Sequence, residues 1–133
     1  MDFLSGIHAT SSALKAERIR MDVVAQNIAN ANTTRDVDGQ AYRRKVVSFE
    51  SLLSPTGETG VRVADVTTDD TPGERVHNPG HPHADKEGMV RMPNVSTSTE
   101  MVDLITASRA YEANLAVVRN ARQMAVRALS IGR

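Results

Sequence analysis

The chain has 133 residues, with sixteen basic and sixteen acidic side chains and no cysteine or tryptophan. This length suits one domain, and the balanced charge argues against nucleic acid or an anionic membrane as the main partner. The missing cysteines exclude disulfides and thiol catalysis. Two Phe and two Tyr are the only aromatic residues. Because aromatic side chains supply much of the buried area of small cores, we expect the apolar stripes to be buried between helices, or between subunits.

The N-terminus reads MDFLSGIH and lacks the basic and apolar regions of a cleaved signal peptide. No run of eighteen apolar residues is present, so we expect no membrane-spanning segment. A protein with this sequence that leaves the cytoplasm would use an export route without a cleaved signal peptide.

Residues 2–31 are predicted to form one long helix. One heptad row is apolar at each of its positions, namely Ile7, Leu14, Met21 and Ile28. This spacing is typical of a coiled-coil seam, although Thr10 and Glu17 interrupt the companion row. The helix has a weak N-cap, so we expect its first turns to fray when nothing packs on them.

Three asparagines, Asn27, Asn30 and Asn32, lie close to the end of this helix. Asparagine is unfavourable inside a helix, and it tolerates the left-handed conformation in which many helices stop. We therefore expect the helix to stop near Asn32.

Residues 34–96 are predicted to be a small insertion of turns and short strands. Residues 43–50 and 61–66 alternate between apolar and polar side chains, which favours a β hairpin or small sheet. The dipeptide Asp38-Gly39 indicates a turn. Residues 76–85 contain two prolines and have no periodicity, so we expect an extended loop there.

Residues 97–131 are predicted to form a second long helix. Thr97 has the position of an N-cap, and Glu100 could complete a capping box. The apolar residues form three rows: Leu104, Tyr111, Val118 and Ala125; Met101, Leu115 and Leu129; and Val117, Ala121, Met124, Ala128 and Ile131. An ordinary helical bundle would explain one such face, but several rows imply two partners or one broad partner.

The predicted fold is mainly α, with two long terminal helices packed as an antiparallel coiled coil and a small irregular or β insertion at one end. Residues 1–33 and 97–133 would form the helical axial core, and residues 34–96 the insertion. The predicted assembly interface consists of Ile7, Leu14, Met21, Ile28, Leu104, Tyr111, Leu115, Val118, Met124 and Leu129.

Two groups of residues suggest metal ligands at first sight. His77, His81, His83 and Asp85 are of the right types, but two prolines restrict their convergence, and zinc ligands usually occur in two pairs. We expect a polar loop whose histidines cap turns or contact a neighbour. Residues 36–39 resemble part of an EF-hand loop, but its twelfth position would be Lys45, where calcium needs a carboxylate. We therefore predict no metal and no other cofactor.

The remaining motifs do not indicate catalysis. The basic triplet at residues 43–45 has no nearby aromatic partners, which favours a solvated strand edge or a contact between subunits over a nucleic-acid site. The sequence contains no glycine-rich phosphate loop and no Ser-His-Asp grouping with a nucleophile elbow. We predict that the protein is not an enzyme and binds no small-molecule substrate.

Several stretches resemble the bacterial flagellar axial proteins, a family of rod, hook and hook-junction subunits. AQNIANANT at residues 25–33 is similar to the N-terminal signature of this family, and ASRAYEAN at residues 107–114 to its C-terminal signature. Residues 42–50, 79–85 and 89–95 resemble the proximal rod subunits in particular. The family motif residues are Asn27, Asn30, Asn32, Thr33, Arg109, Tyr111, Glu112 and Asn114. The resemblance covers essentially the whole chain, although His83 stands where the family pattern has an acidic residue.

The resemblance implies that the terminal helices pack as a coiled coil and polymerise, with copies of this chain and with other rod subunits, into a helical rod that crosses the periplasm. It also implies that the subunit passes unfolded through the flagellar type III export apparatus. Two alternatives stay open. A distal rod or hook subunit would have a larger middle region, and a free coiled-coil adaptor would form a discrete oligomer.

Overall fold

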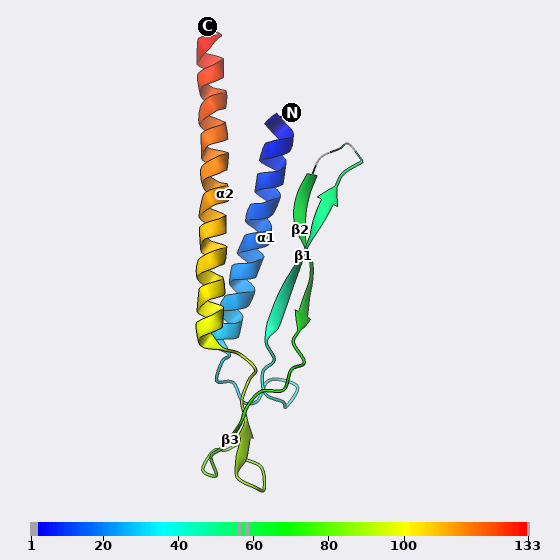
Figure 1. The fold of residues 1–133 in the computed structure, drawn as a ribbon, viewed down its shortest axis with the longest axis vertical. Helices are drawn as coiled ribbons and strands as arrows, with labels where there is room; N and C mark the ends of the chain where they lie inside the picture. The colour runs from blue at the N-terminus through cyan, green and yellow to red at the C-terminus, as the bar shows by residue number, and fades with distance from the viewer. Residues whose placement is uncertain (1–2, 56, 58, 133) are drawn as a thin grey trace.

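The computed structural model of the chain describes residues 3–55, 57 and 59–132. Two long helices, α1 (Phe3–Ala29) and α2 (Thr97–Ile131), lie side by side and antiparallel (Figure 1). Between them in sequence are four strands: β1 (Lys45–Leu53), β2 (Thr59–Thr68), β3 (Arg75–His77) and β4 (Met89–Arg91). They form two separate antiparallel hairpins, β1–β2 and β3–β4. The prediction of two long terminal helices around a small β insertion is confirmed. Neither helix, over its described residues, is long and apolar enough to cross a membrane.

Helix α1 lies between α2 and the β1–β2 hairpin (Figure 1). The prediction that the insertion lies at one end is therefore wrong for this hairpin, which returns along α1, and correct for β3 and β4. Small residues allow the close approach: the Ser12 hydroxyl accepts a hydrogen bond from the Val61 N–H at 3.0 Å. Ala16 and Val23 are buried, and Ala16 lies beside the hairpin. This second packing face was missed because alanine and serine carry little apolar signal.

Helix α1 ends at Ala29, slightly before the predicted stop. No described residue other than glycine has a positive φ, so the expected left-handed asparagine is absent from the described chain. Instead, the Thr33 N–H donates to the Asn30 carbonyl, and the Thr33 hydroxyl donates to the Asn30 side chain, each at 3.0 Å. Asparagine thus ends the helix through a hydrogen-bonded turn. The predicted turn at Asp38-Gly39 is confirmed, and there Gly39 supplies the positive φ of 80°.

The predicted hairpin is confirmed as β1–β2, with a register shift between Ser48 and Phe49. The loop predicted at residues 76–85 is wrong at its start, where Val76 and His77 pair with Val90 and Met89. Ahead of this second hairpin, a Cβ on Gly73 would lie 1.8 Å from the Met92 carbonyl oxygen. Two backbones therefore cross at a point that admits only glycine.

Helix α2 directs a row of mostly small residues inward. Ala107 and Ala121 are buried, and Leu104, Tyr111 and Val118 beside them are half-buried. Met101 is 51% exposed and Leu129 75% exposed, so these two members of the predicted row lie outside the seam inside the subunit, whereas Leu115 is half-buried. Helix α2 has 35 residues against 27 in α1, and it extends beyond the start of α1 (Figure 1).

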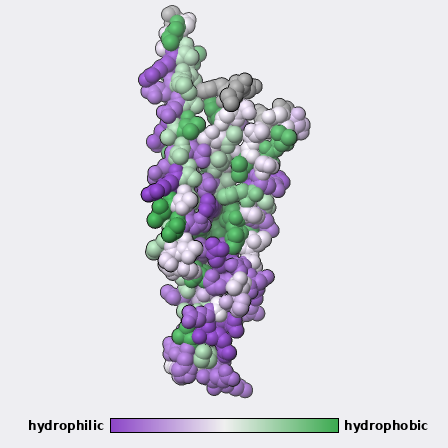
Figure 2. Space-filling model, in the orientation of Figure 1, coloured by the Kyte–Doolittle hydropathy of each residue, from purple (hydrophilic) through white to green (hydrophobic). Residues whose placement is uncertain are grey.

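The apolar core is small. Its buried members are Ala16, Val23, Val24, Tyr42, Val90, Ala107 and Ala121. Most of these side chains bury little area, and buried apolar area is the main source of folding free energy. Figure 2 shows hydrophobic side chains exposed over the helical half, whereas the end that carries β3 is mostly hydrophilic.

Amide hydrogen exchange in the isolated subunit should follow this distribution of burial. Residues 23–27 of α1 should exchange slowest because they pack on both α2 and β1, whereas residues 122–131 of α2 should exchange fast because all of them except Ala125 are exposed. Mass spectrometry on a monomer verified by sizing would measure both segments. Equal protection along the whole of α2 would contradict the expectation.

Candidate functional site: a buried polar anchor and an exposed helical surface

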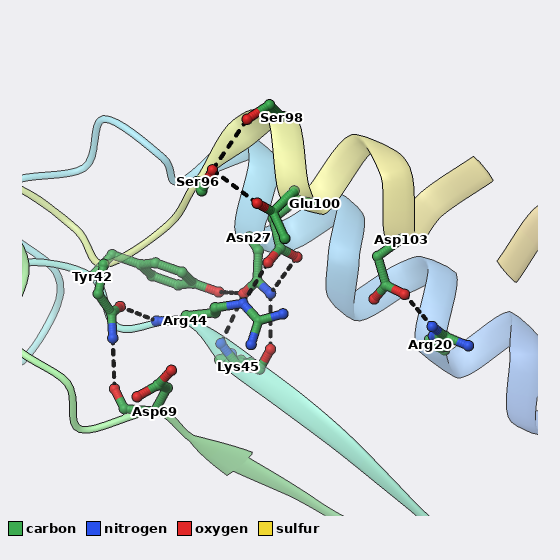
Figure 3. A network of polar contacts seen from close by, with 12 residues as sticks. Arg20, Asn27, Tyr42, Arg44, Lys45, Asp69, Ser96, Ser98, Glu100 and Asp103 are labelled. Carbon is green, nitrogen blue, oxygen red and sulfur yellow. Dashed lines mark hydrogen bonds and ion pairs between the residues drawn. The ribbon is translucent and has the colours of Figure 1, made fainter. Parts of the chain in front are cut away.

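Asn27 of α1 is fully buried, and its amide makes four hydrogen bonds (Figure 3). Its Nδ2 donates to the Lys45 carbonyl at 2.8 Å and to Glu100 Oε2 at 3.0 Å. Its Oδ1 accepts from the Tyr42 hydroxyl and from the Lys45 N–H, both at 2.9 Å. Both donor hydrogens and both acceptor lone pairs are used, which is the full capacity of an asparagine amide.

Glu100 is also fully buried, in the first turn of α2. Its Oε1 pairs with the Arg44 Nε, while its Oε2 accepts from Asn27. The predicted capping box is therefore wrong: Ser96, with φ −95° and ψ 105°, is the N-cap residue, and no side chain caps the helix. The carboxylate pairs inside the protein with a cation and an amide, whereas Ser96 and Thr97 are exposed, so water can solvate the first turn.

The hydrogen-bonded cluster continues into the insertion. The Arg44 N–H donates to Asn94 Oδ1 at 2.7 Å, and Asn94 Nδ2 donates to the carbonyls of Asp69 and Thr71 at 2.9 and 2.8 Å. We call Asn27, Tyr42, Arg44, Asn94 and Glu100 the polar anchor. It joins both helices to β1 and to the segments that flank the β3–β4 hairpin.

Two basic residues of the triplet have partners within the chain. Arg44 pairs with buried Glu100, so the prediction of a solvated or intersubunit position is wrong for it. Arg43 is exposed and pairs with Asp70 at 2.9 Å. Further along the helices, Arg20 of α1 pairs with Asp103 of α2 (Figure 3). This ion pair joins the two helices directly and helps to fix their antiparallel alignment.

Burial raises the pKa of the Tyr42 phenol above its usual value of 10, and the carboxylates of Asp36 and Glu100 raise it further. A raised folded-state pKa stabilises the fold below pH 10, and this contribution is lost as pH rises through the folded value.

Tyr42→Phe should lower the free energy of unfolding by about 1 kcal/mol at pH 7, because it removes one hydrogen bond to the Asn27 amide. The variant should also lose less stability than the wild type above pH 10, because it has no buried phenol to ionise there. Urea unfolding at pH 7 and pH 11 measures both effects. Parallel losses in the two proteins between these pH values would contradict the assignment.

The predicted family motif residues divide into internal and external positions. Asn27 lies in the polar anchor, and Asn30 and Thr33 form the turn after α1. The others are Asn32, Arg109 and Glu112, which are exposed, and Tyr111 and Asn114, which are half-buried.

The residues of the predicted assembly interface also divide. Ile7, Leu14, Met21, Ile28, Leu104, Tyr111, Leu115 and Val118 are half-buried, whereas Met124 and Leu129 are exposed. Ile7, Val118 and Met124 line one groove between the helices. Their role in assembly stays a prediction.

Two families of known proteins match this chain, one near each end. The family described as "Flagella basal body rod protein" matches residues 7–35, and "Flagellar basal body rod FlgEFG protein C-terminal" matches residues 86–131. The flagellar basal-body rod protein FlgC of Yersinia enterocolitica is 43% identical over 133 residues, which cover 99% of each chain. FlgC of Bacillus subtilis is 40% identical over 150 aligned positions and 100% of each chain, and FlgC of Borreliella burgdorferi is 39% identical over 98% of each. The chain belongs to the FlgC family of flagellar basal-body rod proteins.

In this FlgC-family chain, the polar anchor connects the two regions that match the rod families. Asn27 lies in the first region, and Asn94 and Glu100 lie in the second. Tyr42 and Arg44 come from the segment between the two regions. Sequence reasoning missed that Arg44, Asn94 and Glu100 meet in a buried cluster, because charged and amide side chains are normally solvated. The one available signal was Asn27, an amide side chain of a type that is unfavourable inside a helix, within the predicted apolar helix.

The loop between β3 and β4, which carries His81, His83 and Asp85, is organised by hydrogen bonds. Asp85 accepts the backbone N–H groups of Glu87 and Met89, each at 2.9 Å, and pairs with Arg75 at 2.8 Å. The hydrogen bond from the Met89 N–H makes the largest contribution to lowering the Asp85 pKa. The Glu87 N–H and Arg75 lower this pKa further. The His81 Nδ1 accepts the His83 N–H at 3.0 Å, which is the turn-capping role expected from the sequence.

His83, where the sequence departs from the family pattern, lies against the turn that follows α1. Its Nδ1 lies 2.7 Å from the Thr34 hydroxyl. Partial burial lowers the His83 pKa, and the charges of Arg35 and His81 lower it further. The contact between His83 and Thr34 joins the loop between β3 and β4 to the segment that follows α1.

Proposed function

We propose that this chain polymerises through α1 and α2, as a coiled coil in contact with neighbouring subunits, to build the proximal part of the flagellar rod. One observation carries the proposal: α2 exposes apolar side chains on more than one side. They are Met101, Val102, Ile105, Val117, Met124, Val126, Leu129 and Ile131. Contiguous exposed apolar surface on a folded subunit is typical of an interface with another protein.

The polar anchor supports this role mechanically. It holds α1, α2 and the insertion in one arrangement through fully satisfied hydrogen bonds. Buried polar networks of this kind specify a single geometry more strongly than apolar contacts of the same size. A subunit that repeats along a rod needs a fixed orientation between the two helices, through which it would polymerise, and the insertion.

The small core supports export of an unfolded chain and folding on assembly. The apolar side chains buried within the subunit are mostly alanine and valine, so the free subunit should unfold at low cost. We infer that the chain passes through the type III export apparatus without a cleaved signal peptide and folds in the periplasm as it joins the rod. Its partners would be other copies and other rod subunits, and its role structural rather than catalytic.

Two measurements test the proposal. A tagged chain expressed in a strain that lacks its own copy should be recovered in purified basal bodies and restore swimming. The purified protein should be monomeric or should polymerise without a fixed size. A discrete oligomer of constant size, together with absence from basal bodies, would instead support the free coiled-coil adaptor.

A further inference from the structure

A small polar pocket of about 280 Å³ lies between the segment that follows α1 and the β3–β4 hairpin. Thr34, Arg35 and Gln40 line it from the first side, and His83 and Arg91 line it from the second. We call it the arginine pocket. None of its described lining residues is acidic, whereas two of them carry a guanidinium group that is always charged. The pocket therefore has two positive charges and no counter-ion in its wall.

Neither arginine of this pocket forms an ion pair with a described residue. The acidic side chains of the surrounding segments are paired elsewhere. Asp70 pairs with Arg43 at 2.9 Å. Asp85 and Glu87 both pair with Arg75, at 2.8 and 3.6 Å. The β3–β4 hairpin thus places its two paired carboxylates on one arginine and none on the arginine that faces the pocket.

The register of the hairpin adds to this local excess of positive charge. Arg75 and Arg91 lie directly opposite each other on β3 and β4, and like charges in that position destabilise a sheet. The two carboxylates beside Arg75 offset its charge, whereas Arg91 is exposed and has no described counter-ion. An anion bound beside Arg91 would complete the neutralisation of this cross-strand pair.

The other polar groups of the pocket suit an anion. The Gln40 Oε1 accepts from an Arg43 N–H at 2.6 Å, which leaves the Gln40 NH₂ group as a donor without a described partner. The His83 Nδ1 lies 2.7 Å from the Thr34 hydroxyl. Burial and then the charge of Arg35 lower the His83 pKa below its usual value of 6.5, so the ring is mainly neutral at pH 7.

We propose that the arginine pocket binds an oxyanion, a phosphate or carboxylate group, between Arg35 and Arg91. Guanidinium groups donate paired hydrogen bonds to the oxygens of both kinds of group, which makes arginine the usual residue at such sites. A pocket of about 280 Å³ is smaller than most sites for drug-sized ligands, so it suits a small ion or one acidic side chain. The bound group would join the segment after α1 to β4. This site is independent of the proposed function.

The first test measures binding of inorganic phosphate to the purified full-length chain. The Tm, followed by circular dichroism at pH 7, should rise saturably by roughly 3–6 °C when phosphate replaces chloride at constant ionic strength. Arg35→Gln and Arg91→Gln should each weaken the apparent affinity by roughly tenfold or more, because each removes a charge-assisted contact. Lys86→Gln is the control, since it makes the same change of charge at an exposed position outside the pocket lining, and it should bind phosphate as the wild type does.

The second test supplies the anion from within the chain. His83→Glu introduces a carboxylate at a position that lines the pocket, so the Tm without phosphate should rise and the affinity for phosphate should fall by roughly tenfold or more. His83→Gln has the same length without the charge, and it should keep the phosphate response of the wild type.

The general stabilisation of proteins by phosphate would raise the Tm of every variant equally. Equal responses of wild type, Arg35→Gln and Arg91→Gln would therefore overturn the site, and so would equal responses of His83→Glu and His83→Gln. Where these pairs differ as expected, recovery in purified basal bodies identifies the source of the oxyanion. Recovery of His83→Glu that falls at least tenfold below that of His83→Gln would assign it to an acidic side chain of a neighbouring subunit, and equal recovery would assign it to a free ion.

Discussion

Asn27→Asp should lower the free energy of unfolding by about 3–5 kcal/mol at pH 7, although it exchanges one NH₂ group for an oxygen. The new oxygen would face the Lys45 carbonyl and the Glu100 carboxylate, to which the wild-type amide donates. Two hydrogen bonds would be replaced by repulsion between buried acceptors. Urea unfolding monitored by circular dichroism measures the loss. A loss below about 1 kcal/mol would show that the polar anchor contributes little to stability.

The stability that Asn27→Asp loses should also depend on pH, and the loss should become smaller as pH falls. Burial and the nearby Glu100 carboxylate would raise the folded-state pKa of the new carboxyl group above its unfolded value of about 3.9. The penalty is then complete above the folded pKa and disappears as pH falls towards the unfolded value. The gap in stability between variant and wild type should therefore narrow between pH 7 and pH 4. Asn32→Asp is the control, because Asn32 is exposed, and it should change stability by less than about 0.5 kcal/mol at either pH.

Leu14→Asp should abolish rod assembly while leaving export intact. Leu14 is half-buried in the middle of α1, so in the free subunit the aspartate could still reach water. In a rod whose neighbours cover this row, the charge would lose its hydration at a cost of several kcal/mol, and the lost leucine contacts add about 2–5 kcal/mol. We expect the variant to be soluble and exported, with no swimming and with later axial proteins missing outside the cell.

Ser11→Asp is the comparison for this experiment, since Ser11 lies on the same helix and is exposed. It should be milder in swimming assays. Normal flagella with Leu14→Asp would show that the row of Ile7, Leu14, Met21 and Ile28 does not face a neighbouring subunit. Degradation of the variant before export would show that this row holds the free subunit together instead.

The amino-acid sequence by itself determined the elements whose signals are local. The seven-residue recurrence of Ile7, Leu14, Met21 and Ile28 predicted α1, and the apolar rows after Thr97 predicted α2 to its last residue. Alternation predicted the β1–β2 hairpin, and Asp38-Gly39 predicted the turn that precedes β1. The signatures around Asn27 and Tyr111 indicated the flagellar family, which the relatives confirm over nearly the whole chain.

Only the tertiary structure decided which side chains are buried together. Glu100 follows Thr97 with the spacing of a capping box, yet its carboxylate lies against Asn27 and Arg44, which are distant in sequence. A local pattern cannot show that a cation and an amide from other elements will compete for the same carboxylate. The return of β1–β2 along α1 was likewise invisible, because it depends on small residues such as Ser12 and Ala16, whose effect is to permit close approach rather than to drive burial.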